Sequence, residues 1–129
     1  MKPELGFALF FALTLILLGV VVASGLKARM RVHIPAVIGA LACLGTAVFF
    51  AVQLGDIFDL EAAGVITPVH LSLAKIATVS YLLPLVTGVL TYRDRSKKRL
   101  HFRVAMLVLV LTVLAALSGT WMILASPRL

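Results

Sequence analysis

The chain contains four stretches that are long, apolar and almost free of charge, and these limit what it can fold into. Each matches the roughly 20 apolar residues that cross a bilayer, and Lys75 is the only charged residue within them. They run over residues 5–26, 34–55, 67–92 and 104–126. Of the 129 residues, 62% are apolar, against roughly 45–50% in soluble domains. The sequence therefore predicts an integral membrane protein without a separate soluble domain.

The short connections between these stretches predict the architecture. Consecutive helices that are joined by short loops become antiparallel neighbours, so we expect an all-α, up-down-up-down four-helix bundle forming one transmembrane domain over residues 1–129. The expected helices cover about residues 5–26, 34–55, 67–92 and 100–126. The first stretch exceeds the roughly 7–15 apolar residues of a signal peptide, which favours a retained spanning helix. Pro84 lies inside the third helix and should kink it near Ser80.

Charged residues are distributed unevenly between the connections. The first and third connections hold nine of the 12 Lys and Arg residues against Asp94 alone, whereas the middle connection and the two tails hold the other four acids. The positive-inside rule then places both termini outside and the basic loops in the cytoplasm of a bacterial-type inner membrane. Attraction to anionic lipid headgroups explains the basic excess, so membrane lipids are the expected partners and nucleic acid is not.

One cysteine and no acidic cluster exclude several kinds of chemistry. Cys43 cannot form an intramolecular disulfide or a Cys-x-x-Cys-His haem attachment site, and we interpret it as a packing residue. All five acidic residues lie in connections or tails, which disfavours a small multidrug-type transporter with a membrane-embedded carboxylate. No serine, cysteine or carboxylate constellation indicates a hydrolase.

A weak internal repeat relates the two halves of the chain. Arg31-Val32-His33-Ile34 opens the second helix, and Arg99-Leu100-His101-Phe102 opens the fourth, 68 residues later. Gly19-Val20-Val21 precedes the first basic loop in the way that Gly88-Val89-Leu90 precedes the second. Two halves related by a pseudo-twofold axis along the membrane normal would make His33 and His101 face each other at one depth.

Two facing histidines in a helical bundle point to haem. Neutral imidazoles are the axial ligands of b-type haem iron, and a bundle core supplies an apolar slot for the macrocycle. We therefore predict an inner haem b between His33 and His101, with glycines Gly39 and Gly88 allowing close approach of the ring. The haem propionates should be hydrogen-bonded by arginines on the cytoplasmic side, namely Arg29, Arg31, Arg99 and Arg103. The alternative is that both histidines merely contact lipid headgroups.

His70 opens the third helix on the opposite side, where the chain has no second histidine. An outer haem at His70 would need Gln53, Met122 or water as its second ligand, so one haem is favoured over two. A quinone site, with His70 hydrogen-bonding a quinone carbonyl, is the rival interpretation, and a simple structural role at the helix start is the third. Lys75 could extend outward to the acidic middle connection.

The order of these motifs resembles a family. Arg-Val-His33, Pro-Val-His70 and Arg-Leu-His101 open successive helices, and Ser118-Gly119 follows late in the fourth. Over about residues 29–125, this order is similar to small four-helix membrane proteins near cytochrome oxidase assembly functions, to half of haem A synthase and, more distantly, to ascorbate-reducible cytochromes b. The resemblance implies two histidines on each side of the membrane, with His33 and His101 as the inner pair. Gln53 stands where the second outer ligand is expected.

Two functions follow from these patterns. The first is a haem b membrane protein for electron transfer, exchanging electrons with a quinone or another donor, or for haem handling. The alternative is a non-catalytic accessory or assembly subunit that has no cofactor and buries its apolar faces against partner membrane subunits or a second copy of the chain.

Overall fold

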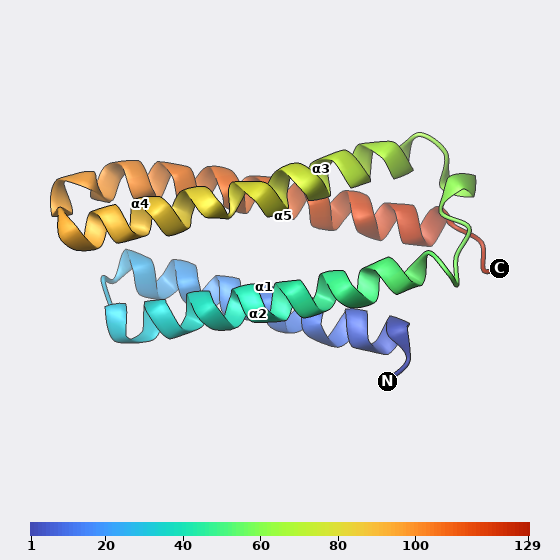
Figure 1. The fold of residues 1–129 in the computed structure, drawn as a ribbon, viewed down its shortest axis with the longest axis horizontal. Coiled ribbons are helices and arrows are strands. Elements are labelled where there is room, and N and C mark those ends of the chain that lie inside the picture. Colours follow the sequence, from blue (N-terminus) through green and yellow to red (C-terminus); the bar gives the residue numbers. More distant parts are fainter. The chain divides into compact units, whose positions relative to one another are not determined.

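The computed structural model describes residues 1–129 as helices joined by short connections (Figure 1). Two 3-10 helices, η1 (Glu61–Ala63) and η2 (Arg95–Lys97), lie in the connections. The five α-helices are α1 (Pro3–Leu26), α2 (Met30–Leu54), α3 (Ile66–Ser80), α4 (Leu82–Arg93) and α5 (Lys98–Ala125). Because α4 follows α3 after one residue, the chain has four helical segments of membrane-spanning length and composition. The predictions of an all-α chain and of four helical segments long and apolar enough to span a membrane are confirmed.

The chain divides into two compact units, Met1–Ile57 and Phe58–Leu129. The first unit is a hairpin of α1 and α2, and the second is a hairpin in which α3 and α4 together pack against α5. We call these units the first and the second hairpin. In each hairpin a short basic loop joins the helices at one end, which we call the loop end. We call the opposite end the open end.

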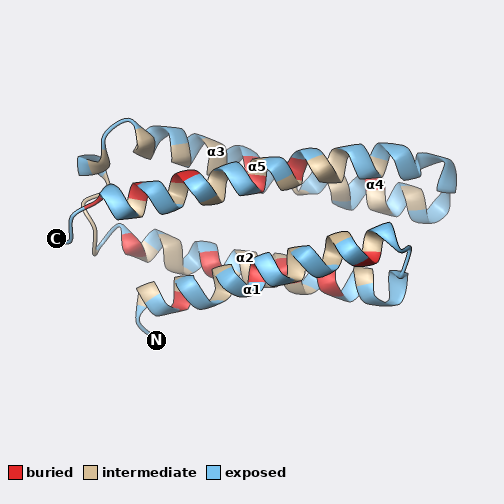
Figure 2. Ribbon diagram, turned by 180° about the vertical axis from the view of Figure 1, so that it is seen from behind, coloured by how far each residue is buried: buried red, intermediate tan, exposed pale blue.

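Small side chains hold the first hairpin together. Ala36, Ala40 and Ala47 of α2 are 2–6% exposed, and Gly6, Thr14 and Ser24 of α1 are buried against that helix. The buried positions form a stripe along the line where the helices meet (Figure 2). Large apolar side chains of both helices are exposed on the outward surfaces. This distribution is typical of membrane helices, because small residues allow close packing and lipid solvates the large ones.

A short turn closes the first hairpin. The backbone N–H of Arg29 donates to the carbonyl oxygen of Ser24 (2.9 Å) and that of Ala28 to Gly25 (3.1 Å), which is the pair of bonds that defines a Schellman helix end. Ala28 occupies the position that usually holds glycine, with φ at 52°. The turn therefore fixes the backbone of Ser24 and Gly25 at the end of α1.

The helical segment formed by α3 and α4 is interrupted near Pro84, as the sequence predicts. α3 ends at Ser80 and α4 begins at Leu82, because the ring of Pro84 removes an N–H and collides with the carbonyl four residues earlier. Tyr81 lies at the break, and its phenol is 2.7 Å from the hydroxyl of Thr112 on α5. Thr112 donates to the carbonyl of Val108, so the Tyr81 hydroxyl is the donor between the helices.

The start of α2 differs from the prediction. It begins at Met30 rather than Ile34, and α5 begins at Lys98. The predicted start followed the apolar stretch, which does not include Arg29 and Arg31. Arginine is nevertheless a good helix former, so the helix begins before that stretch does. Pro35 consequently lies inside α2 rather than in its first turn.

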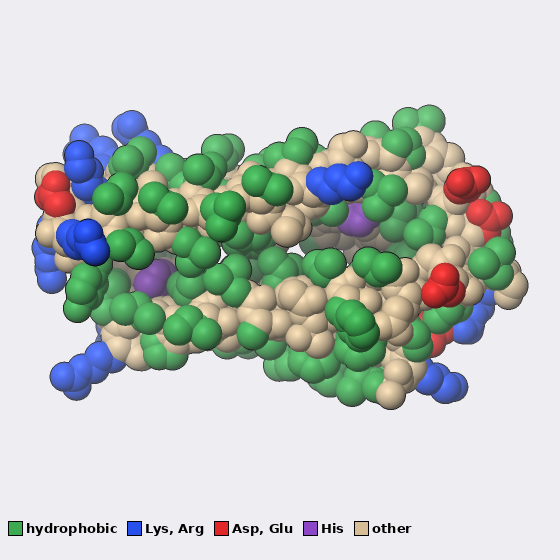
Figure 3. All heavy atoms as spheres, in the orientation of Figure 1, with side chains coloured by type: hydrophobic (Ala, Val, Ile, Leu, Met, Phe, Trp, Pro, Cys, Tyr) green, Lys and Arg blue, Asp and Glu red, His purple; other side chains and the backbone are tan.

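Both ends of the second hairpin are tied by local contacts. At the open end, the N–H of Asp59 donates to the carbonyl of Pro127 (2.9 Å), and the guanidinium of Arg128 lies 5.6 Å from the ring centre of Phe58. At the loop end, hydrogen bonds from the hydroxyl and the N–H of Ser96 hold the pKa of Asp94 below its usual value. Lys and Arg side chains surround this loop (Figure 3).

Candidate functional site: three histidines held by a neighbouring helix

His101 contacts a hydroxyl and a glycine of the preceding helix. It is the fourth residue of α5, and its Nδ1 lies 3.1 Å from the hydroxyl oxygen of Thr87 on α4. Thr87 is 9% exposed. The next residue, Gly88, leaves space for the imidazole, since a Cβ there would stand 3.3 Å from Cε1 of His101.

His33 occupies the same place in the first hairpin. It is the fourth residue of α2, and its Nδ1 lies 3.3 Å from the hydroxyl oxygen of Ser24 and 2.9 Å from the carbonyl oxygen of Val21. A Cβ on Gly25 would stand 3.0 Å from Cε1 of His33. The Schellman turn described above therefore ends on the two residues that hold His33.

His70 is held in the same way at the open end of the second hairpin, with the helix order reversed. It projects from α3 onto α5, where its Nδ1 is 3.1 Å from the hydroxyl oxygen of Ser118. A Cβ on Gly119 would stand 2.6 Å from Cε1 of His70, closer than real Cβ atoms approach. We call each arrangement of a histidine on a Ser/Thr-Gly pair a histidine seat.

The hydroxyl in each seat determines which histidine nitrogen carries hydrogen. Ser24 donates to Val20 O (2.6 Å), Thr87 to Leu83 O (2.8 Å) and Ser118 to Ala115 O (3.1 Å). A serine or threonine hydroxyl has one proton, and when it is donated to these carbonyls the oxygen accepts from the imidazole. At His33 the carbonyl of Val21 can only accept, so Nδ1 donates, and in the neutral ring Nε2 carries the lone pair. The carbonyl partners of Thr87 and Ser118 favour the same direction at His101 and His70.

This tautomer has the donor set that haem iron requires. A metal-bound histidine typically coordinates through one ring nitrogen and donates the other N–H to a carbonyl, carboxylate or similar acceptor, which fixes the ring and raises its basicity. No group of three or more His, Cys, Asp or Glu side chains could hold a metal ion, but a porphyrin supplies four ligands itself and takes one or two from the protein. The residues of the seats thus fit an axial haem ligand.

The other predicted site residues lie around the seats or within the hairpins. Arg29 and Arg31 are exposed at the loop end of the first hairpin, and Arg99 and Arg103 are exposed at that of the second. Gly88 packs on His101, whereas a Cβ on Gly39 would stand 3.4 Å from Cδ1 of Leu17. Each glycine thus accommodates a side chain of its own hairpin, and their predicted role beside the macrocycle stays a prediction.

The two residues considered as partners of His70 make contacts of their own. Gln53 donates from Nε2 to the carbonyl of Phe49 on its own helix, at 3.5 Å. Met122 is 5% exposed and lies within the core of the second hairpin. Lys75 is exposed on α3.

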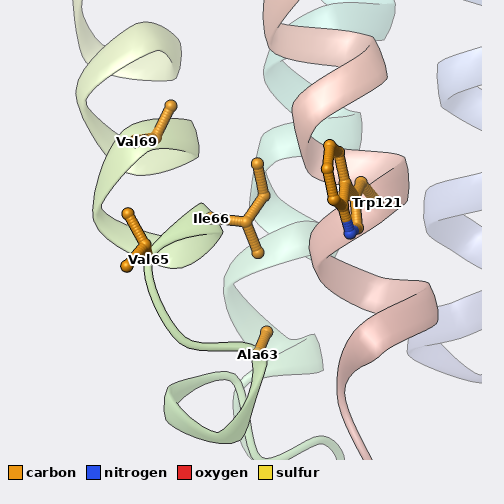
Figure 4. Close-up of a pocket in the computed structure, with 5 residues that line it drawn as sticks. All are labelled: Ala63, Val65, Ile66, Val69 and Trp121. Carbon is orange, nitrogen blue, oxygen red and sulfur yellow. The ribbon is translucent and has the colours of Figure 1, made fainter.

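A shallow apolar groove of about 330 Å³ lies between α3 and α5 at the open end of the second hairpin (Figure 4). Ile66 precedes His70 by one turn on α3, and Trp121 follows Ser118 by about one turn on α5, so the groove begins one turn beyond the His70 seat. Its lining has no ionisable side chain and consists of Ala63, Val65, Ile66, Val69 and Trp121.

Sequence reasoning found the histidines and named Gly88 and Ser118-Gly119 in other roles, but it missed that a Ser/Thr-Gly pair holds each histidine. It paired Gly19 with Gly88, but nothing lies within 4 Å of a Cβ on Gly19, and Gly25 is the glycine that contacts a histidine. The usable signal was the Ser/Thr-Gly dipeptide, present as Ser24-Gly25, Thr87-Gly88 and Ser118-Gly119. Comparison with protein-family models, curated proteins and solved structures found no match, so function is inferred from the chemistry of the seats.

Proposed function

We propose that the protein is an integral membrane haem b protein in which His33 and His101 are the axial ligands of one inner haem. The observation that carries this proposal is the shared contact of Nδ1: in each hairpin Nδ1 of the loop-end histidine lies against a hydroxyl of the neighbouring helix, and with Nδ1 as the donor, Nε2 holds the lone pair that an iron would take up.

The proposed site combines one ligand from the loop end of each hairpin. The Val21 carbonyl and the Ser24 hydroxyl orient His33, and the Thr87 hydroxyl orients His101. Exposed arginines at the two loop ends are the proposed partners of the propionates, because guanidinium groups pair well with carboxylates. These are Arg29, Arg31, Arg99 and Arg103.

When bound, haem supplies a one-electron redox couple, and the proposed activity is electron transfer within the membrane, with haem handling as its variant. The charge distribution supports an orientation in which the basic loops face the cytoplasm and both termini lie outside, in a bacterial-type inner membrane. Lipid is the expected neighbour of the exposed apolar surfaces, and a quinone is the proposed small-molecule electron partner.

The test is the haem content and the reduced-minus-oxidised spectrum of the detergent-purified full chain, prepared from cells supplied with haem. We expect low-spin haem b in the wild type and its loss in His33→Ala and in His101→Ala. Thr46→Val is the matched control, because the Thr46 hydroxyl is exposed and bonds only to its own helix through Ala42. It should keep full haem content.

The supporting hydroxyl gives a second, graded readout. Thr87→Val keeps the His101 ring but removes its acceptor, and loss of such a supporting contact typically weakens metal binding by about 10–100-fold. Full haem in both histidine variants would overturn the ligand assignment. An absence of haem from the wild-type protein would favour the alternative, an accessory subunit without a cofactor.

A further inference from the structure

Two polar side chains of α3, Ser72 and Lys75, have no bonding partner within the second hairpin. Every other serine or threonine in the α-helices donates its hydroxyl to a backbone carbonyl, as Thr78 does to Ala74 O at 2.8 Å. The Ser72 hydroxyl forms no such bond, and the Lys75 ammonium forms neither a hydrogen bond nor an ion pair. Both side chains therefore keep donors for a ligand or a partner.

Ser72 and Lys75 are neighbours on one exposed face of α3. Residues three or four apart lie next to each other on a helix surface, and both side chains are exposed. Side chains lean toward the N-terminus of their helix, which directs Lys75 toward Ser72. The other neighbours of Lys75 are the exposed Thr78 and the apolar Leu71 and Val79, which are 45% and 67% exposed. We call these five residues the Lys75 face.

The depth of Lys75 in the membrane limits which anion can reach it. The spanning segment Ile66–Arg93 has 28 residues. At a helical rise of about 1.5 Å per residue, Lys75 lies about 7 Å from the midpoint of this segment. A hydrocarbon layer about 30 Å thick, centred on the segment, then places the Lys75 backbone about 8 Å inside its nearer edge. Lipid phosphates lie outside this layer, so they are not at the depth of Lys75.

The chain has no carboxylate that could lie beside Lys75 at this depth. All five acidic residues lie outside the four apolar stretches, and they are Glu4, Asp56, Asp59, Glu61 and Asp94. Neither hairpin therefore supplies the anion, and a second copy of the chain lacks it as well. A charged side chain inside a membrane is costly and is almost always paired.

We propose that the Lys75 face binds a transmembrane helix of a partner protein, and that this helix carries a carboxylate inside the hydrocarbon layer. Lys75 pairs with the carboxylate, and the Ser72 hydroxyl donates to its second oxygen. Ser72 and Thr78 are small enough to let the partner helix approach closely. A neutral acceptor, such as a quinone carbonyl, would leave the charge of Lys75 unbalanced. The interaction does not require haem and is independent of the proposed function.

The probe is a synthetic leucine-rich transmembrane peptide with a single Glu at the depth of Lys75. Its association with the full chain is measured by energy transfer between labelled peptide and labelled protein in phosphatidylcholine vesicles. We expect the Glu peptide to bind about ten-fold more strongly than the same peptide with Gln, because close charge pairs at interfaces couple strongly. A peptide whose Glu lies at its end, among the headgroups, should lose this preference.

Variants of the chain separate the ion pair from general helix packing. Lys75→Met should abolish the preference for the Glu peptide, and Lys75→Arg should keep it. Lys97→Met is the matched control, because it removes the same charge from the exposed basic loop. Ser72→Ala should weaken binding of the Glu peptide several-fold. Thr78→Val should leave that binding unchanged, because the Thr78 hydroxyl already bonds to Ala74.

Three outcomes would overturn the inference. The first is equal binding of the Glu and Gln peptides to the wild type, and the second is a preference that survives in Lys75→Met. The third is a preference that disappears when phosphatidylglycerol replaces part of the phosphatidylcholine, since a lipid headgroup would then be the anion at Lys75.

Discussion

At the scale of single residues, the tightest contact is between His70 and Gly119. A Cβ at position 119 would stand only 2.6 Å from Cε1 of His70, which leaves no room for a side chain, and the Ser118 hydroxyl holds the same ring through Nδ1. Hydroxyl and glycine thus act together, one by attracting the ring and the other by allowing it to approach.

Gly119→Ala should therefore destabilise the protein, although alanine is the better helix former. Overpacking costs about 1–3 kcal/mol, because either the His70 ring or α5 must move. The free energy of unfolding in mixed detergent micelles measures this. At Gly45, which is open on all sides, the same change should be neutral or stabilising by up to about 1 kcal/mol. Equal effects at the two glycines would contradict the close packing at His70.

The contrast between the histidines and their supports explains what the sequence could predict at this scale. The chain has only three histidines, and each stands at the start of a predicted helix, so His33, His70 and His101 were found. The roles of Ser24, Thr87 and Ser118 were not found, because a hydroxyl in a membrane helix usually bonds only to its own backbone. Thr46, Ser80 and Thr120 do just that, whereas Tyr81 bonds to Thr112 on another helix. Ser118 was noted only as part of the motif order.

At the scale of elements, the turn of the first hairpin carries a local conflict. Ala28 adopts a φ of 52°, in the left-handed region where a Cβ costs roughly 1–2 kcal/mol. The two backbone bonds of the Schellman end hold it there. This strain lies three residues from Gly25 and five from His33.

Ala28→Gly should relieve this strain and raise the free energy of unfolding by about 0.5–1 kcal/mol, since glycine's greater freedom in the unfolded chain offsets part of the gain. The same detergent unfolding assay applies. Ala23→Gly, at an exposed position inside α1, is the control and should instead cost about 1 kcal/mol. A loss of stability in both variants would exclude the left-handed turn.

The ends of the helices could be predicted from the sequence where the length of an apolar stretch or a proline sets them. The break before Pro84 was predicted because its cause is local and steric. The start of α2 was not, because the charged residues that end an apolar stretch do not necessarily end a helix. Hydropathy indicates which residues can lie in lipid, but the helix itself can extend beyond these residues.

At the scale of the whole molecule, the charge pattern predicts how the chain lies in its membrane. In a Cys43→Ala background, a cysteine introduced by Ala62→Cys in the middle connection should react with an impermeant maleimide added to intact cells. One introduced by Lys97→Cys in the third connection should react only after permeabilisation. Both native residues are exposed. The reverse labelling pattern would overturn the proposed orientation and move both termini to the cytoplasm.

The number of spans could be predicted from composition, but the difference between the hairpins could not. The repeat in the sequence relates His33 to His101 and suggests two equal halves. Packing shows otherwise, since the open end is closed by Phe50 in one hairpin and bears His70 in the other. The pairing of His33 with His101 across one haem rests on the repeat and stays a prediction.

Nδ1 of His33 meets Ser24 and Val21 of its own hairpin, and this has a consequence for biosynthesis. A ribosome finishes α1 and α2 while more than half of the chain is still unmade, and an imidazole entering lipid at that stage is costly without a partner. Val21 and Ser24 meet this need at once. Nδ1 of His33 can therefore enter the membrane with its hydrogen-bond partners already present, before the second hairpin has been synthesised.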